Sequence, residues 1–249
     1  MQPLSLLDQA RLDTIRQANR RRPVSVVGIY RLTPHIQRVT LRELESDAAD
    51  ATGPADWIKL YVPHSGEDRT HGRAYTVRER SEGTIVLDMA VHDGLCASWA
   101  QQAHPGDRAE ISGPRKGFKL AWPSGDVLLG ADETGLPAVA NIVAGLPPNA
   151  SGAVWLEVPD DADVLPLDAP RQVAVRYLPR KAAPPGRLLI EAMREAPILP
   201  TTMVWVAAER TAALELREYF EAHLPRQQVS TSGYWRKPAV HAPYIERSA

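Results

Sequence analysis

Cysteine is almost absent from this sequence. Its 249 residues include one cysteine, Cys96, so an internal disulfide is impossible and a cysteine-rich metal site is excluded. We expect Cys96 to be structural rather than redox-active, because no second cysteine exists to resolve an oxidised thiol. The seven histidines are scattered, and none forms a ligand pair at helical spacing. The sequence therefore predicts no permanent metal site.

Long apolar runs and an excess of charge of one sign are also missing. No apolar stretch is long enough to cross a bilayer, and the N-terminus lacks the charged start and apolar core of a signal peptide. Lys and Arg number 29 against 30 for Asp and Glu, so nothing favours nucleic acid or a membrane surface as a partner. We expect a cytoplasmic protein in which local cations hold any anionic ligand.

Composition and turn residues divide the chain into three parts. Hydrophobic residues make up 44% of the chain, enough for one large domain or two of ordinary size. Ser5-Leu6-Leu7-Asp8 resembles a capping box and predicts an N-terminal helix within residues 1–22. The residue pattern then changes near residue 122, so residues 23–122 and 123–249 are expected to form two domains.

Residues 23–122 are expected to form a small antiparallel barrel. They contain about six short β-type runs separated by turn residues, which is typical of such barrels. A short helix is predicted over Cys96–Ala103, after Gly94, which permits a tight turn. The predicted strands are Val24–Arg31, Ile36–Arg42, Trp57–Val62, Arg73–Arg78, Thr84–Val91 and Arg108–Ser112.

Residues 123–249 alternate between apolar β-runs and helical stretches, which is typical of a doubly wound α/β domain with a parallel sheet. Ligands of such sheets bind beyond the carboxyl ends of the strands. Polar segments that include Asp132 and Arg180 follow predicted strands directly. The predicted strands are Val127–Leu129, Ala153–Val158, Val173–Tyr177, Met203–Ala207 and Gln228–Ser230, and the predicted helices are Leu136–Gly145, Gly186–Arg194 and Thr211–His223.

The stretch His71–Arg78 combines groups that can bind a flat ring and a phosphate together. In a strand, Arg73 and Tyr75 share one face, and Thr76 and Arg78 share the other. Arginine supplies a fork of donors that fits phosphate oxygens, and tyrosine supplies a flat apolar face with a polar tip. Taken alone, the same pattern is typical of an edge strand with a solvated face.

The start of the predicted helix near Gly94 is a second candidate for ligand binding. Free backbone N–H groups and the positive end of the helix dipole suit a pyrophosphate, and Ser98 adds a hydroxyl donor. The alternative is an ordinary helix cap at Asp93 or Ser98. The Arg-x-Tyr-Thr strand upstream favours the ligand-binding interpretation.

The ordered set of motifs is more specific than any one of them. From about Pro23 to Lys237, the chain resembles the siderophore-interacting proteins, which are cytoplasmic flavin-dependent ferric-siderophore reductases related to the ferredoxin-reductase group. The segments that carry the resemblance are His71–Arg78, Val91–Ala100, Pro105–Asp107, Ser112–Gly117, Gly130–Ala138 and Gly233–Arg236.

The resemblance implies an antiparallel FAD-binding β-barrel followed by a doubly wound α/β nicotinamide-binding domain, a β + α/β fold. The family commonly has Gly-Pro where Leu95-Cys96 stands here, so we expect this loop to hold pyrophosphate differently. Tyr234 and Trp235 are expected over the flavin or adenine ring, the alternative being packing between the domains. The residues implied in FAD binding are Arg73, Ala74, Tyr75, Thr76, Arg78, His92, Gly94, Ala97, Ser98, Trp99, Tyr234 and Trp235.

The resemblance also implies NADPH or NADH as electron donor, bound near Asp132, Glu133 and Thr134. This turn is not a Gly-x-Gly-x-x-Gly fingerprint, and its two carboxylates repel pyrophosphate, which predicts weak and transient binding. Arg180 and Lys181 follow a strand where a 2′-phosphate could sit, which favours NADPH. The alternatives are two solvated loop charges and a different donor, such as a ferredoxin.

The implied acceptor is a ferric siderophore, and an anionic catecholate is favoured. Because the net charge is near zero, its site needs several converging cations, and the candidates are Lys59, Arg115, Lys116 and Arg236. No catalytic acid–base set is expected, because the flavin carries the difficult chemistry. Two other functions stay open: a general flavin reductase with another acceptor, and a non-catalytic siderophore-binding protein.

Overall fold

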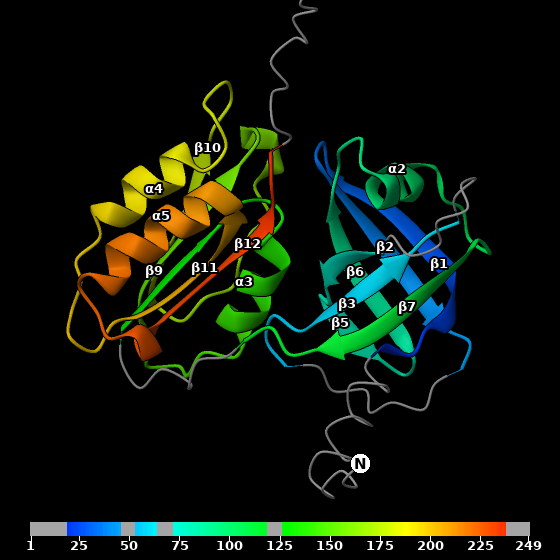
Figure 1. The fold of residues 1–249 in the computed structure, drawn as a ribbon, viewed down its shortest axis with the longest axis horizontal. Coiled ribbons are helices and arrows are strands. Elements are labelled where there is room, and N and C mark those ends of the chain that lie inside the picture. The colour runs from blue at the N-terminus through cyan, green and yellow to red at the C-terminus, as the bar shows by residue number, and fades with distance from the viewer. Residues whose placement is uncertain (1–18, 46–52, 64–71, 119–125, 238–249) are drawn as a thin grey trace, which may run out of the picture.

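The computed structural model describes residues 19–45, 53–63, 72–118 and 126–237. These residues form two β-sheets of different kinds that lie side by side (Figure 1). Most of the helix predicted within residues 1–22, and the boundary predicted near residue 122, lie outside the described residues.

The first sheet is antiparallel and curls into a barrel. Its order is β4-β3-β7-β1-β2-β6-β5. The end strands β4 and β5 follow one another in the chain with Val77 and Arg78 between them, so this segment closes the barrel. The strands are β1 (Arg22–Thr33), β2 (Ile36–Glu43), β3 (Trp57–Tyr61), β4 (Arg73–Thr76), β5 (Glu79–Ser81), β6 (Thr84–Ala90) and β7 (Arg108–Arg115).

Alternating side chains build the interior of the barrel. Val24 and Val26 of β1 and Val39 and Leu41 of β2 point inward and are fully or almost fully buried, as the period of two requires. The helix α2 (Leu95–Gln102) buries Cys96 and Ala100 in the same core, and so covers one end of the barrel (Figure 1).

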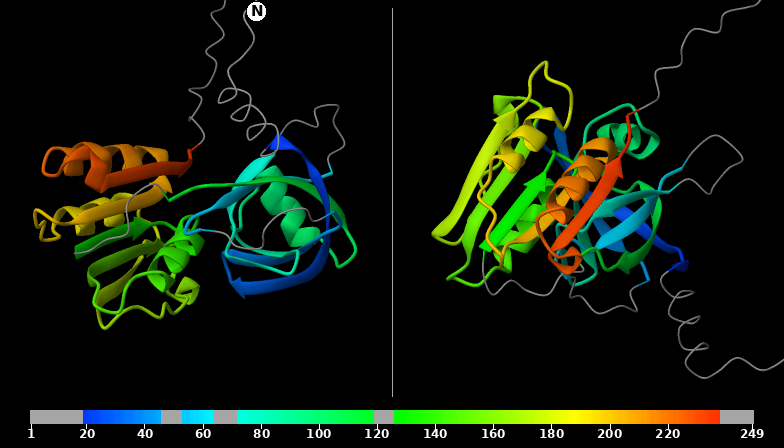
Figure 2. Two further views of the ribbon diagram at one scale, coloured as in Figure 1. Left: turned by 90° about the horizontal axis from the view of Figure 1, so that it is seen from below. Right: turned by 60° about the vertical axis from the view of Figure 1, so that its left-hand side comes forward.

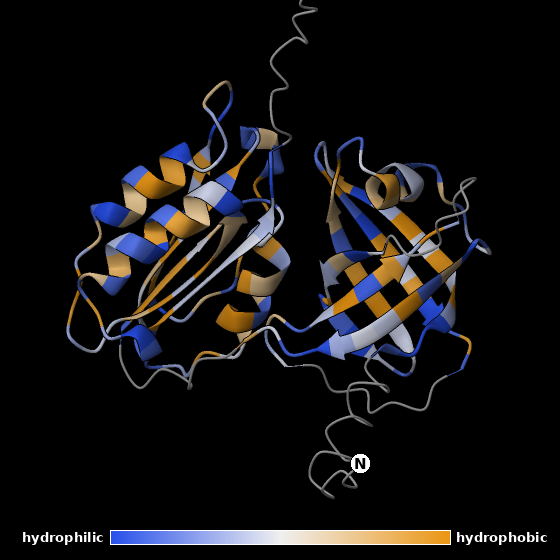
Figure 3. Cartoon of the chain, viewed as in Figure 1, coloured by the Kyte–Doolittle hydropathy of each residue, from blue (hydrophilic) through white to orange (hydrophobic). Residues whose placement is uncertain are grey.

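The second sheet is parallel throughout, with the order β10-β9-β8-β11-β12. Helix α3 packs on one face, and α4 and α5 pack on the other, so the sheet separates two apolar cores (Figure 3). This is the doubly wound arrangement that the sequence predicts. The elements are β8 (Asp126–Ala131), α3 (Leu136–Ala144), β9 (Ser151–Val158), β10 (Gln172–Pro179), α4 (Arg187–Arg194), β11 (Met203–Glu209), α5 (Arg210–Glu221) and β12 (Val229–Trp235), with 3-10 turns η1 (Asp161–Asp163) and η2 (Arg226–Gln228).

Two predicted boundaries differ from the observed ones in ways that matter for the site. Strand β4 ends at Thr76, and the short strand β5, which was not predicted, follows it. The last strand extends to Trp235 instead of ending at Ser230, so the aromatic pair lies within β12. Ser230, Thr231 and Ser232 precede these aromatics in the strand, and the apolar periodicity that indicates a strand is therefore weak in β12.

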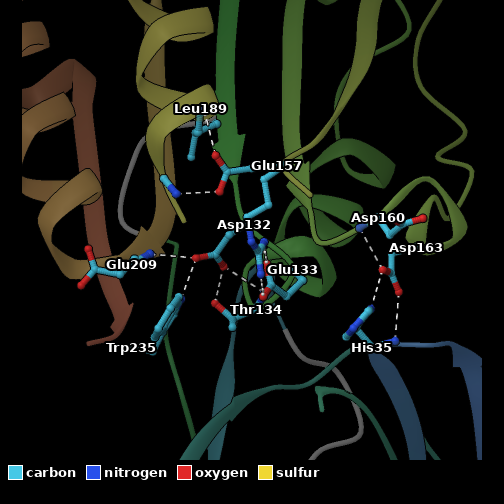
Figure 4. Close-up of polar contacts among 12 residues, drawn as sticks. His35, Asp132, Glu133, Thr134, Glu157, Asp160, Asp163, Leu189, Glu209 and Trp235 are labelled. Carbon is cyan, nitrogen blue, oxygen red and sulfur yellow. Dashed lines mark hydrogen bonds and ion pairs between the residues drawn. The ribbon is translucent and has the colours of Figure 1, made fainter. Parts of the chain in front are cut away.

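Two sets of side-chain contacts join the barrel to the α/β domain. In the first, Asn141 of α3 donates to the Val77 carbonyl at 2.8 Å and accepts from Arg78 at 3.1 Å. In the second, the Thr33 hydroxyl of the β1–β2 turn donates to buried Asp163 of η1 at 2.7 Å, and the His35 ring contacts the same carboxylate at 2.7 Å (Figure 4). Helix α3 accordingly lies on the side of the parallel sheet that faces the barrel (Figure 2).

Candidate functional site

A cavity of about 610 Å³ lies between the two domains. Strand β4, the end of β6, the start of α2 and the segment after β7 line it from the barrel side. The α/β domain contributes Thr134 and residues 232–236 of the β12 end. The cavity therefore meets the carboxyl edge of the parallel sheet, where ligands of such sheets bind.

Strand β4 carries the Arg-x-Tyr-Thr motif into the cavity, where all four residues Arg73–Thr76 contribute to the lining. The Arg73 guanidinium is exposed, and its hydrogen bond within the described residues is a 3.4 Å contact to the Gly72 carbonyl. The Tyr75 ring is largely enclosed, and its burial raises the pKa of the phenol. The Thr76 hydroxyl is buried and, among the described residues, makes no hydrogen bond of acceptable geometry.

The start of α2 presents backbone donors to the cavity. Gly94 is the N-cap and supplies no side-chain cap, which leaves first-turn N–H groups available. The His92 ring accepts from the Gly94 N–H at 2.9 Å. A Cβ at Gly94 would lie 2.4 Å from the His92 ring, so a larger residue would displace this side chain.

The α2 residues that line the cavity are shifted by two positions from the predicted ones. Leu95 and Cys96 contribute to the lining beside His92 and Gly94. The predicted contacts Ala97, Ser98 and Trp99 lie outside it: Ala97 is buried, the Ser98 N–H is used by the helix, and Trp99 packs on the barrel core. Burial raises the pKa of the Cys96 thiol, which keeps it protonated.

The opposite wall is formed by the aromatic pair at the end of β12. A register shift between Ala208 and Glu209 of β11 leaves Tyr234 without a paired residue, so that Tyr234 and Trp235 both line the cavity despite being adjacent in sequence. Burial raises the pKa of the Tyr234 phenol, and the neighbouring Thr76 hydroxyl opposes this effect. The two walls of the cavity thus approach each other at these hydroxyl groups.

Asp88 and Trp57 line the cavity but were not among the predicted residues. The Asp88 carboxylate is held by Arg38 through two hydrogen bonds of 2.6 and 2.8 Å, which neutralise it. Arg38 and Asp88 are direct partners in the β2–β6 register. The two residues are 50 positions apart in the chain, so no local pattern reveals the pair.

The residues predicted to bind NAD(P)H are mostly engaged with other side chains. Of the five, Thr134 lines the cavity. Glu133 binds Arg180 through two bonds of 2.6 and 2.7 Å, and Lys181 pairs with Asp161 at 3.0 Å on the surface. The Arg180 guanidinium is therefore engaged by Glu133, whereas Lys181 stays about two-thirds exposed beside Asp161.

Carboxylates also occupy the helix starts at this edge of the sheet. Glu157 accepts from the backbone N–H groups of Gly186 and Leu189 at the start of α4, and Glu209 caps α5 through Thr211 and Ala212. These two carboxylates thus accept hydrogen bonds from the backbone N–H groups at the starts of α4 and α5, where a phosphate group would otherwise bind.

The predicted cations surround the side of the cavity that the barrel forms. Lys116 and Arg236 line it. The Arg115 guanidinium lies 5.0 Å from the ring centre of Trp57, which also lines the cavity. Lys59 is in register with the cavity residue Ala74. Arg78, also predicted to bind FAD, donates to Asn141 of α3 and is not among the residues that line the cavity.

The residues of the cavity fit a flavin dinucleotide. Arg73 and the start of α2 supply donors for phosphate oxygens, the buried Thr76 hydroxyl supplies a further polar contact, and Tyr75 and Trp235 supply flat aromatic surfaces. A barrel followed by a parallel α/β domain, with such a cavity between them, defines a two-domain flavoprotein of the ferredoxin-reductase type.

Comparisons with known proteins identify the family within this class. The family model of the siderophore-interacting FAD-binding domain matches residues 64–118, and that of the siderophore-interacting protein matches residues 125–238. An uncharacterised protein of Mycobacterium tuberculosis is 31% identical over 255 residues, which cover 85% of this chain and 89% of that protein. The chain belongs to the siderophore-interacting protein family.

Solved structures and a further named relative are also similar to this chain. The crystal structure of a siderophore utilization protein from T. fusca has a TM-score of 0.79 at 31% identity and covers 90% of this chain and 95% of that chain. The ferric vibriobactin reductase ViuB of Vibrio cholerae is 27% identical over 183 residues, 70% of this chain and 68% of the relative. The ferredoxin reductase of carbazole 1,9a-dioxygenase shares the fold, with a TM-score of 0.65 at 14% identity, covering 87% of this chain and 70% of that chain.

Within residues 19–45, 53–63, 72–118 and 126–237, no group of three or more His, Cys, Asp or Glu residues is arranged to hold a metal ion. None of the helices in the same ranges is long and apolar enough to cross a membrane.

Proposed function

We propose that this protein is a cytoplasmic, FAD-dependent ferric-siderophore reductase that takes electrons from NAD(P)H and releases Fe(II) from the chelate. One observation carries the proposal: a single interdomain cavity combines phosphate donors, aromatic walls and flanking cations. The family assignment and the similarity to a ferric vibriobactin reductase support the same reaction class.

The barrel domain, proposed as residues 23–122, holds FAD. Arg73 and the first-turn N–H groups of α2 bind the pyrophosphate, because both present donors without strong internal partners. Thr76 and Tyr75 contact the ring system from one side, and Tyr234 and Trp235 close it from the other. When bound, FAD supplies the conversion between a two-electron donor and a one-electron acceptor.

The α/β domain, proposed as residues 123–249, receives the nicotinamide dinucleotide at the carboxyl edge beside Thr134. The dinucleotide loses a hydride, which is one proton and two electrons, so one NAD(P)H reduces two ferric chelates and one proton is released. Because Arg180 and Lys181 already have carboxylate partners, we propose little discrimination between NADPH and NADH.

The acceptor binds outside the flavin edge, where cations are available. Lys116 and Arg236 line the cavity, and Arg115 and Lys59 lie beside it. A single exposed cation contributes little because water and salt screen it. Several cations that converge on one ligand attract an anionic ferric catecholate more strongly than a neutral chelate.

An anaerobic assay with the purified full chain tests the proposal. A yellow protein whose flavin absorbance is bleached by NADPH or NADH and restored by a ferric catecholate, with Fe(II) trapped by a chromogenic chelator, supports it. A preference for free flavin or dye over iron chelates would instead indicate a general flavin reductase. A colourless protein that binds ferric siderophore would indicate a non-catalytic binder. If only a ferredoxin reduces the bound flavin, the electron donor is the ferredoxin and not NAD(P)H.

A further inference from the structure

Asp132 is enclosed directly behind the aromatic wall of the cavity. The residue is fully buried, and its carboxylate accepts four hydrogen bonds. One oxygen accepts from the Thr134 N–H at 2.9 Å and the Thr134 hydroxyl at 2.6 Å. The other accepts from the Glu209 N–H at 2.8 Å and the Trp235 indole N–H at 2.7 Å (Figure 4).

These four bonds connect three neighbouring strands. Asp132 follows β8, Glu209 ends β11 and Trp235 ends β12, and these strands are adjacent in the parallel sheet. The carboxylate therefore links the ends of β8, β11 and β12 at the carboxyl edge of the sheet. Thr134 and Trp235 both line the cavity, whereas Asp132 does not contribute to its surface.

We infer that Asp132 is a positioning residue that sets the orientation of the Trp235 indole and the Thr134 hydroxyl in the flavin cavity, rather than a ligand of the nicotinamide dinucleotide. The inference rests on the proposed function of the cavity. An ionised carboxylate has about four acceptor sites, and the chain itself uses all of them. No acceptor site is left for a ribose hydroxyl or a nicotinamide amide.

The indole is suited to such an anchor because it has a single donor, which lies in the plane of the ring. A hydrogen bond to a fixed acceptor therefore restricts the rotation of the ring as well as its position. The acceptor is itself fixed by three other bonds from Thr134 and Glu209. The aromatic face that Trp235 presents to the cavity is thus defined before a flavin binds.

Protonation of Asp132 would break this arrangement. Burial, with a contribution from Glu133, raises the pKa of Asp132 to about 6, against the lowering effect of the bonds from Thr134 and Trp235. Other charged or titratable groups that interact with it are Arg180 and Tyr234, and the Glu209 backbone is bonded to it. A protonated carboxyl has one fewer acceptor site, so one of the four donors loses its partner.

The indole N–H signals of the full-length protein test the anchor without reference to activity. In ¹H–¹⁵N spectra of the chain, which has six tryptophans, the signal missing in Trp235→Phe identifies Trp235. We expect the Trp235 indole N–H proton to have a downfield chemical shift, which moves upfield as the pH falls through about 6. In Asp132→Asn this chemical shift should lie upfield and should not change with pH. The control variant Asp168→Asn, at an exposed position, should leave the chemical shift of Trp235 unchanged.

FAD affinity gives the second measurement. We expect Asp132→Asn and Trp235→Phe each to weaken FAD binding by about ten-fold, the loss of one charge-assisted hydrogen bond. The double variant should lose little more than either single one, because both changes remove the same interaction. Thr134→Val removes one donor with a smaller steric change and should reproduce part of the shift in the Trp235 signal if Asp132→Asn fails to fold.

An unchanged Trp235 signal in Asp132→Asn, or fully additive losses of FAD affinity, would overturn the inference. A wild-type protein that does not bind FAD would overturn the proposed function instead. In that case the indole measurement still decides whether Asp132 anchors Trp235, so the two failures are distinguishable.

Discussion

Glu133 and Arg180 form an ion pair with two parallel hydrogen bonds of 2.6 and 2.7 Å across the carboxyl edge of the parallel sheet. Both side chains are nearly nine-tenths buried. Arg180 follows β10 and Glu133 follows β8, so the pair crosses over the intervening strand β9. Two of the groups that the sequence assigns to the dinucleotide therefore bind each other.

The first prediction concerns this pair. Because removal of one partner leaves a buried charge without its counterion, Arg180→Ala should lower the free energy of unfolding by about 3 kcal/mol. Lys181→Ala, whose partner Asp161 is exposed, should change stability far less, because water screens a surface ion pair. Urea denaturation measures both.

The same two variants test the choice of dinucleotide. We expect the ratio of kcat/KM for NADPH to that for NADH to change by less than about three-fold in either variant, since Arg180 is held by Glu133 and a single exposed cation such as Lys181 contributes little. A selective loss of activity with NADPH, at unchanged stability, would show that the cations bind the 2′-phosphate after all.

The second prediction concerns FAD. Arg73→Ala should give a folded but largely colourless protein, because Arg73 supplies charge-assisted bonds to phosphate and has only a 3.4 Å contact to the Gly72 carbonyl within the described residues. Arg108→Ala is the matched control, since Arg108 is an exposed barrel arginine outside the cavity lining. The ratio of the absorbance in the visible flavin bands to the absorbance of the protein measures the FAD content. A fully yellow Arg73→Ala protein with unchanged affinity would contradict the assignment.

The third prediction concerns the acceptor. Lys59→Ala, Lys116→Ala and Arg236→Ala should each raise the KM for an anionic ferric catecholate by about three- to ten-fold and leave FAD content intact, because each removes one cation of a converging set. This increase in KM should become smaller as the salt concentration rises. A neutral ferric hydroxamate is the control substrate and should be affected less. An equal increase in KM for the charged and the neutral chelate would indicate a structural defect.

The fourth prediction concerns the contact of the β1–β2 turn with Asp163. Burial alone would raise the pKa of Asp163, but the hydrogen bonds from Thr33 and His35 outweigh it, and the pKa lies below its ordinary value. A carboxylate with a lowered pKa stabilises the folded state above its unfolded pKa, and this contribution disappears as the pH falls through the folded pKa.

Asp163→Asn should therefore lower the free energy of unfolding at pH 7 by about 2 kcal/mol, and the difference from wild type should shrink below about pH 4. His35→Ala, which removes only part of the contact, should have a smaller effect. Thermal unfolding across pH 3–8 measures this. A difference that stays constant across this range would mean that ionisation of Asp163 does not contribute.

Much of the fold could be predicted because it depends on local periodicity. Alternation in segments such as Ile36–Glu43, and continuous apolar runs such as Met203–Glu209, are properties of adjacent residues. The same holds for the Arg73–Thr76 motif, whose residues all reach the cavity. Strand β12 was predicted too short because its polar residues hide the period, and parallel pairing with β11 extends it to Trp235.

The chemistry of the site depends on residues that are distant in sequence. The sequence alone predicted two kinds of sheet, their order along the chain and the Arg73–Thr76 segment that lines the cavity, because these follow from side-chain patterns within a few residues. Folding determined which groups remain free to bind: Arg180 is paired with Glu133, Asp88 with Arg38, and Asp132 with Trp235, 103 residues away. The physical reason is that a buried charge must find its partner within a few ångströms in space, and the sequence does not state which distant residue folding places there.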